Sequence, residues 1–123
     1  MRTEYISEEM EAIFESIGIP LKEILDSVGV PYNYYQFEAG EMDLPYTVFL
    51  LPESSNFGAD NTVYSGAAKL NIELYTNFKD VVFEGKYEKA FKEHELYWDK
   101  YEGYIKSENM YGVVYGMEVI INV

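Results

Sequence analysis

The clearest pattern of hydrophobic and polar positions lies between residues 68 and 75. Apolar residues take every second position: Ala68, Leu70, Ile72 and Leu74 alternate with Lys69, Asn71, Glu73 and Tyr75. Successive side chains of a strand point to opposite faces, so this alternation predicts a strand with one buried face. We expect it to be the central strand of a sheet, entered through a loop rich in Gly, Asn and Asp.

Three helices are predicted from apolar residues at helical spacing. The first starts after the capping residue Ser7 and ends at Gly18. The second follows Pro20 and ends at Gly29, and its apolar stripe consists of Leu21, Ile24, Leu25 and Val28. The third runs from Asp80 to about His94, after a capping residue at Asn77 or Asp80.

Four further segments have the pattern of strands: 32–37, 44–51, 98–107 and 111–123. The glycine in Ser65-Gly66-Ala67 suggests a bulge at the start of the central strand. Fully extended, the last strand would span ~43 Å at about 3.3 Å per residue. We therefore expect part of the last hairpin to project from the body, with an open edge where a neighbouring subunit can add.

The order helix, helix, strand, strand, strand, helix, strand, strand predicts an α+β fold. We expect a two-layer domain with a mainly antiparallel sheet of about five strands. The N-terminal helices and the helix between strands three and four would pack on one face. The 123 residues fit a single domain, 1–123, in which 1–29 form a helical N-terminal segment and 30–123 form the sheet plus its helix.

Charge and composition narrow the classes of partner. The chain has 22 acidic and 9 basic residues and a net charge of -13, which opposes tight binding to nucleic acids and anionic membranes. It has no cysteine, so disulfides and thiolate metal sites are excluded. The acidic N-terminus does not match a signal peptide, and no window approaches the ~18 to 20 apolar residues of a membrane span. We expect a soluble protein made inside the cell.

Few residues of the sequence suggest catalysis or metal binding. His94, the only histidine, stands between Glu93 and Glu95, where it could act as the general base of a small hydrolase-like enzyme. The alternative is a helix-end histidine favoured by the helix dipole. Asp60 and Asn61, with Glu53, miss the ligand spacing of a calcium loop. We therefore expect no catalytic residue, no cofactor and no metal.

Several segments also carry a resemblance to a known family. They are Gly29-Val30-Pro31-Tyr32, Leu44-Pro45-Tyr46-Thr47-Val48, Asn56 to Tyr64, Ile72 to Thr76 with Lys79-Asp80, and Tyr104 to Glu108 with Tyr111 and Tyr115. In this order they resemble small tail-completion proteins, which are encoded in the tail-gene clusters of long-tailed phages and prophages of Gram-positive bacteria. Asn-Phe-x-Ala-Asp-Asn and Ile-Glu-Leu-Tyr-Thr are the most specific pieces. The helical segment before Gly29 is longer than the family usually has.

The resemblance implies a structural role. Such proteins form a ring, usually six-fold, that ends the tail tube and joins it to the head connector, or stopper, protein. The implied partners are further copies of the chain, the tail tube protein and the connector. The implied location is the host cytoplasm during assembly and then the virion tail. The family offers no catalytic residues to transfer.

Exposed aromatic side chains beside a turn are typical of contact surfaces. The residues predicted for a subunit or tube contact are Asn56, Phe57, Asp60, Asn61, Tyr64 and Tyr111. The competing interpretation is that Phe57 folds back over its own sheet and Asp60 caps the turn.

A different class of function is an acidic DNA mimic that inhibits a DNA-binding enzyme. Four carboxylates would share one face of the first helix: Glu8, Glu9, Glu11 and Glu15. A solvated helix surface explains the same pattern.

Overall fold

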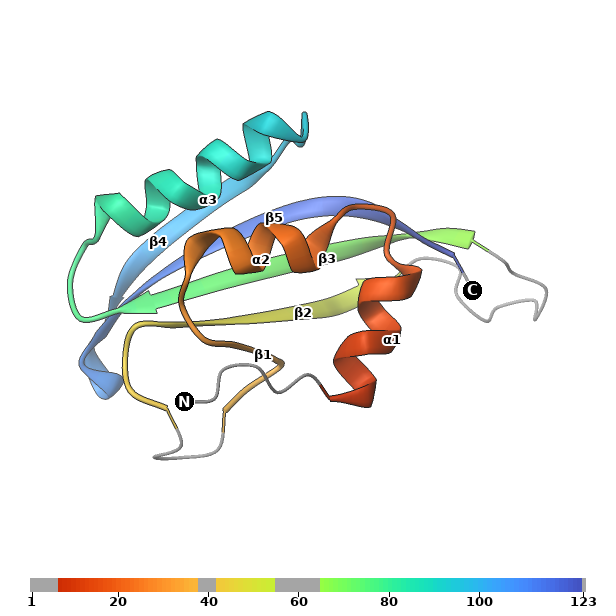
Figure 1. Ribbon diagram of the computed structural model, residues 1–123. Helices are drawn as coiled ribbons and strands as arrows, with labels where there is room; N and C mark the ends of the chain where they lie inside the picture. Colours follow the sequence, from red (N-terminus) through yellow and green to blue (C-terminus); the bar gives the residue numbers. More distant parts are fainter. Residues whose placement is uncertain (1–6, 38–41, 55–64, 123) are drawn as a thin grey trace.

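The part of the chain that the structure describes, residues 7–37, 42–54 and 65–122, contains three α-helices, one 3-10 helix and five strands in a computed structural model (Figure 1). In chain order they are α1 (Glu8–Ser16), α2 (Leu21–Val28), β1 (Tyr32–Tyr34), β2 (Tyr46–Ser54), β3 (Ser65–Thr76), α3 (Val81–Glu93), β4 (Asp99–Ile105), η1 (Lys106–Glu108) and β5 (Met110–Asn122). The predicted order of helices and strands is confirmed.

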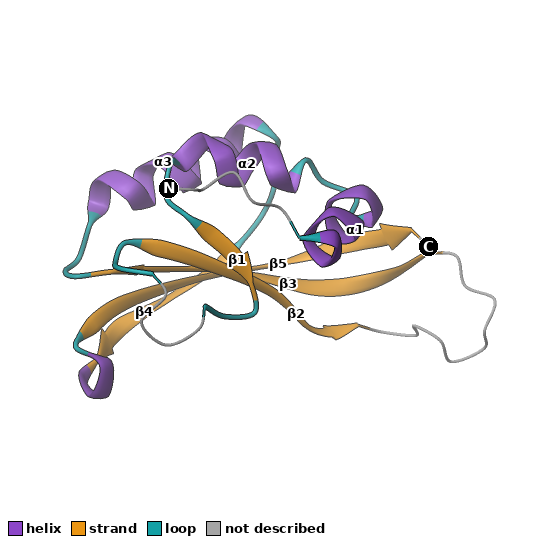
Figure 2. Cartoon of the chain, turned by 60° about the horizontal axis from the view of Figure 1, so that its bottom comes forward, coloured by secondary structure: helices purple, strands orange, loops and turns teal. Residues whose placement is uncertain are grey.

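The strands form one sheet in the order β1-β2-β3-β5-β4, so β3 is the central strand, as predicted. β2, β3, β5 and β4 pair antiparallel, whereas β1 lies parallel to β2. Figure 2 shows α1, α2 and α3 on the same side of this sheet. The predicted α+β fold, two layers with a mainly antiparallel sheet, is confirmed.

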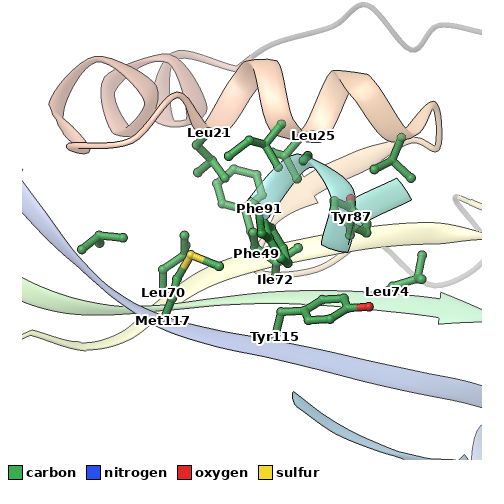
Figure 3. Packing of buried hydrophobic residues seen from close by; sticks show 14 of the residues in the cluster. Leu21, Leu25, Phe49, Leu70, Ile72, Leu74, Tyr87, Phe91, Tyr115 and Met117 are labelled. Atoms are coloured by element: carbon green, nitrogen blue, oxygen red, sulfur yellow. The ribbon is translucent and has the colours of Figure 1, made fainter. Parts of the chain in front are cut away.

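The core fills the space between the helices and one face of the sheet (Figure 3). The predicted inward side chains of β3 are buried: Ala68, Leu70, Ile72 and Leu74. The four apolar residues predicted for α2 are buried as well. Phe91 of α3 meets Tyr115 of β5 edge to face, with ring centroids 5.1 Å apart. Each fully buried large apolar side chain contributes about 1.5–3 kcal/mol, so the helix layer is held mainly by these contacts.

Capping residues begin α1 and α3 where the sequence predicts. The Ser7 hydroxyl accepts a hydrogen bond from the Met10 amide, and the Asp80 carboxylate accepts from two amides in the first turn of α3. Gly29 ends α2 in the left-handed conformation with φ 87°. These local signals depend on residues only a few positions apart, which is why the sequence is sufficient to place them.

Gly18 has a different role from the predicted helix stop. The capping residue at the end of α1 is Ile17, and Gly18 donates its N–H to the carbonyl oxygen of Ile120 in β5 at 2.7 Å. A Cβ atom at Gly18 would lie 2.9 Å from that oxygen. The glycine is therefore required by the close approach of two backbones.

Two predicted strand details are wrong. β1 ends at Tyr34 and does not reach 37, because Tyr35 adopts a left-handed conformation with φ 73°. β3 and β5 pair without a break from Ser65 to Thr76, so there is no bulge at 65–67. The register shift lies instead in β2 between Leu50 and Glu53, beside Pro52, which has no N–H to give to a ladder.

The projecting hairpin is not found. β5 pairs with β3 from Tyr111 to Asn122, so its length lies along another long strand of the body. The predicted open edge is found, because among the described residues β4 pairs only with β5.

Candidate interaction surface

The sheet face opposite the helices, called the outer face here, carries a row of side chains across four strands. Tyr46, Tyr75, Gly112 and Gly103 are directly paired in this order from β2 to β4. The rings of Tyr46 and Tyr75 are 5.7 Å apart. A Cβ atom at Gly112 would lie 2.9 Å from Cε1 of Tyr75. The Tyr75 ring thus covers the glycine opposite it.

A hydrogen bond holds this ring in place. The Tyr75 hydroxyl donates to the Glu73 carboxylate at 2.7 Å on the same strand. Burial raises the pKa of Tyr75, and the bond and the charge of Glu73 raise it further. Tyr75 therefore stays neutral and remains a hydrogen-bond donor.

The next row of the outer face consists of Val48, Glu73, Val114 and Tyr101. Tyr101 is 65% exposed. Between Tyr75 and Tyr101 lies an open hollow of about 260 Å³ over the two glycines Gly103 and Gly112. It is much larger than the about 30 Å³ share of one water molecule, so a partner side chain can enter it.

β4 borders this surface with an exposed edge. All of its residues from Asp99 to Tyr104 are exposed. In an antiparallel pair, only alternate residues hydrogen-bond to the neighbouring strand, so the others direct their N–H and C=O groups outward. Such an edge can add a strand from another chain.

Beneath α3, a network of charged groups holds the helix-facing side of β4. Lys100 lies 2.9 Å from a Glu84 oxygen and 2.7 Å from Glu88. Lys79 bridges the same Glu84 oxygen at 2.9 Å and Glu102 at 2.5 Å. These ion pairs join α3, the turn before it and β4, so the edge strand is tied to the body by charge as well as by its pairing with β5.

Glu84 is the buried centre of this network, with a side chain only 5% exposed. Burial alone raises the pKa of Glu84, but hydrogen bonds from Lys100 and Lys79 outweigh it and hold the pKa below its ordinary value. The bonds to Glu102 and Glu84 raise the pKa of Lys79. The three groups therefore remain charged together, although the second oxygen of Glu84 has no hydrogen-bond partner among the described residues.

Most of the predicted contact residues lie outside the described residues, namely Asn56, Phe57, Asp60, Asn61 and Tyr64. Tyr111 is described, and it lies on the helix-covered face, paired with Thr76 and Tyr104. It is half-buried, and Nζ of Lys79 lies 5.8 Å from its ring centroid. Tyr111 is thus on the opposite side of the sheet from Tyr75 and Tyr101, and its role in a contact stays a prediction.

His94 is the C-terminal capping residue of α3. Its Nε2 lies 3.8 Å from the carboxylate of Glu23 in α2, so the two side chains are near each other where the helices meet. Within the described ranges no group of three or more His, Cys, Asp or Glu residues could hold a metal ion. The four carboxylates of α1, at Glu8, Glu9, Glu11 and Glu15, are all exposed to solvent.

The charge network around Glu84 and the paired glycines Gly103 and Gly112 were not predicted, although the sequence contains a pattern that indicates each. Glu84 occupies the same helical stripe as Tyr87 and Phe91, which predicts a buried carboxylate in need of cationic partners. Gly103 and Gly112 stand at similar distances from the turn at 107–109, as expected of directly opposed residues in a hairpin.

Comparison with known proteins does not assign a function to this chain. No protein-family model matches the chain, and a search of curated proteins finds no match. In the described part of the chain, no helix is long and apolar enough to cross a membrane.

Proposed function

We propose that this protein is a structural, non-enzymatic tail-completion protein of a long-tailed phage or prophage. Copies of the chain form a ring, six-fold as in the family that its segments resemble, which ends the tail tube and meets the head connector. The observation that carries the proposal is the outer face, where Tyr75 of β3 and Tyr101 of β4 border an open hollow. Aromatic side chains at a sheet surface are characteristic of protein contacts.

The outer face is the surface that we assign to the tail tube protein. Tyr101 offers a large, exposed ring, and Tyr75 offers a ring already held by Glu73. Rigid aromatic side chains lose little conformational entropy on binding, so they serve well as anchors. The hollow over Gly103 accepts a complementary side chain of the partner.

The acidic net charge of the chain is suitable for a ring through which DNA has to pass. With a net charge of -13, the walls of a ring would repel phosphates. Bound Lys or Arg side chains would instead hold the DNA by releasing counterions. A channel with an acidic lining therefore lets DNA slide.

The test is electron microscopy of tail tubes assembled from the tail tube protein of the same phage or prophage. In the presence of this protein, we expect tubes of arrested length with a ring at one end. Tyr101→Ser should weaken binding to the tube end at least tenfold, because it removes an exposed aromatic anchor. Phe78→Ser is the matched control, since Phe78 is 63% exposed but lies in the turn before α3.

Two outcomes would count against the proposal in different ways. Tubes that keep growing beside an excess of the protein would exclude the terminator role. Normal capping by Tyr101→Ser would instead move the tube contact away from the outer face. In that case the predicted residues Phe57 and Asp60 are the next to substitute.

A further inference from the structure

β4 presents an incomplete version of an arrangement that is complete inside the chain. Tyr75 lies directly opposite Gly112 and covers it with its ring. Gly103, the next residue in the same row, is uncovered: a Cβ atom there would find no other atom within 4 Å. Tyr101, two positions away on the same face, is exposed. The edge strand thus has a glycine that no ring covers, Gly103, and an exposed tyrosine ring that covers no glycine, Tyr101.

We propose that β4 pairs antiparallel with β4 of a second copy about a two-fold axis at Glu102, and that each Tyr101 covers Gly103 of the other copy. A two-fold axis perpendicular to the sheet keeps the outer faces of both copies on one side. In a register centred on Glu102, all seven residues of β4 are paired. The pairs are Asp99 with Ile105, Lys100 with Tyr104, Tyr101 with Gly103, and Glu102 with itself.

This register repeats the chain's own pairing of tyrosine with glycine. The outer-face row Tyr46, Tyr75, Gly112, Gly103 continues into Tyr101 of the second copy. A register centred on Tyr101 would pair only residues 99–103 of the strand, and it would set the two Tyr101 rings against each other. A register centred on Gly103 would pair only 101–105. The register centred on Glu102 uses the whole strand and fills both hollows.

The electrostatics allow this pairing. Like charges directly opposite each other destabilise a sheet, and Glu102 faces its own copy at the axis. Each Glu102, however, is already 2.5 Å from the Lys79 ammonium of its own chain. Each Glu102 therefore meets its copy with a cation already beside it, which reduces the repulsion at the axis. Repulsion between the two acidic chains is screened beyond about 8 Å at physiological ionic strength.

A second copy fits better than head-to-tail pairing between the two edges of the sheet. The opposite edge, β1, has only three residues and ends where Tyr35 turns left-handed. Of the two edge strands in the described sheet, β1 and β4, only β4 is long, and the edge strand that matches it in length is β4 of another copy. A two-fold contact closes on itself, whereas a ring with two different ends needs head-to-tail contacts. The dimer is therefore a form of the free protein that covers its edge, and it does not depend on the proposed function.

The absence of cysteine from the chain allows a direct test by single-cysteine cross-linking. Opposed residues in antiparallel strands have Cα atoms about 4.5–5.5 Å apart, within the range of about 4.4–6.8 Å that disulfides span. On mild oxidation, Glu102→Cys should become a covalent dimer. Tyr101→Cys and Gly103→Cys should cross-link when mixed together but not singly. Tyr97→Cys, at a residue 94% exposed outside β4, reports random collision.

A second measurement leaves Glu102 and its ion pair intact. Sedimentation of the wild-type protein alone should show a dimer that dissociates on dilution. Gly103→Val should weaken the dimer at least tenfold by blocking the Tyr101 ring, and at concentrations where both proteins are monomeric it should keep the unfolding midpoint, because the site is open within one chain. Gly85→Ala, at an equally open glycine in α3, should leave the dimer unchanged.

The proposal is overturned if the wild-type protein is monomeric at every concentration, or if Glu102→Cys cross-links no better than Tyr97→Cys. Efficient cross-linking of Tyr101→Cys with itself would overturn the register. All of these experiments use the protein alone, so their failure is distinct from a failure to cap tail tubes.

Discussion

Thr47 of β2 and Tyr87 of α3 share a hydrogen bond of 2.7 Å between their hydroxyl groups in the interior of the protein. Both residues are fully buried. Burial also raises the pKa of Tyr87, so its hydroxyl stays protonated at any ordinary pH. The bond joins the helix layer to the sheet, and among the described residues it is the hydrogen bond that satisfies both buried hydroxyls.

Removing both hydroxyls should cost less than the sum of the two single removals. Tyr87→Phe leaves the Thr47 hydroxyl buried without this bond, and we expect a loss of about 1–3 kcal/mol in the free energy of unfolding. Thr47→Val should behave similarly. In the double variant the loss should be smaller than the sum, because no polar group remains unpaired. Urea unfolding measures all three, and strict additivity would contradict the interpretation. Tyr97→Phe, on an exposed ring, should change stability by less than about 0.5 kcal/mol.

Because of the network around Glu84, the free energy of unfolding should decrease at both low and high pH. The pKa of Glu84 is lowered in the folded state, so its contribution is present above the ordinary value of 4.5 and is lost as the pH falls through the lowered pKa. The pKa values of Lys79 and Lys100 are raised, so their contribution is present below 10.5 and is lost as the pH rises through the raised values. Urea midpoints measured from acidic to alkaline pH should fall at both ends.

Substituting Glu84→Gln tests this assignment, because it keeps the shape of the side chain and removes its charge. We expect a loss of about 1.5–3 kcal/mol at neutral pH, where Lys79 and Lys100 lose a charged partner. The acid limb should become shallower in the variant. An acid limb identical to that of the wild type would show that other carboxylates, such as Glu88 and Glu102, cause it.

Two paired glycines of the outer face should respond differently to alanine. Gly112→Ala places a methyl group 2.9 Å from the Tyr75 ring and should destabilise the fold by about 1–3 kcal/mol. Gly103→Ala meets no atom of its own chain, so at concentrations where the protein is monomeric it should be neutral or slightly stabilising, since alanine loses less entropy in a strand. Thermal unfolding of both variants decides this, and equal stabilities would contradict the position of the Tyr75 ring.

Gly18 and Gly85 form a second contrasting pair. Gly18→Ala brings a Cβ atom against the Ile120 carbonyl oxygen, which belongs to the backbone and cannot move aside freely. We expect a loss of about 1–3 kcal/mol. Gly85→Ala, in the middle of α3 with open space around it, should gain about 0.5–1 kcal/mol. A stable Gly18→Ala protein with an intact bond to Ile120 would be at odds with the close approach of α1 and β5.

The candidate surface was only partly predictable. Tyr75 was correctly placed on the polar side of β3, and the open edge was foreseen, but neither was linked to Gly103 or Gly112. The sequence predicts Tyr111 as a contact residue because it is an aromatic residue beside a turn, and the sheet places it under Lys79 on the helix side. Which strands are neighbours decides these relations, and alternation within one strand carries no information about its neighbour.

The sequence by itself determined where helices begin, which face of β3 is buried, and that the chain forms an α+β domain. These features depend on residues only a few positions apart, as at Ser7, Gly29 and the alternation around Leu70. They can therefore be interpreted without the rest of the chain. Only the tertiary structure decided that Gly18 meets Ile120, that β1 runs parallel to β2, and that Glu84 lies between two lysines. Each of these depends on contacts between residues distant in the chain, and such contacts form only when packing the whole core selects one strand order and register.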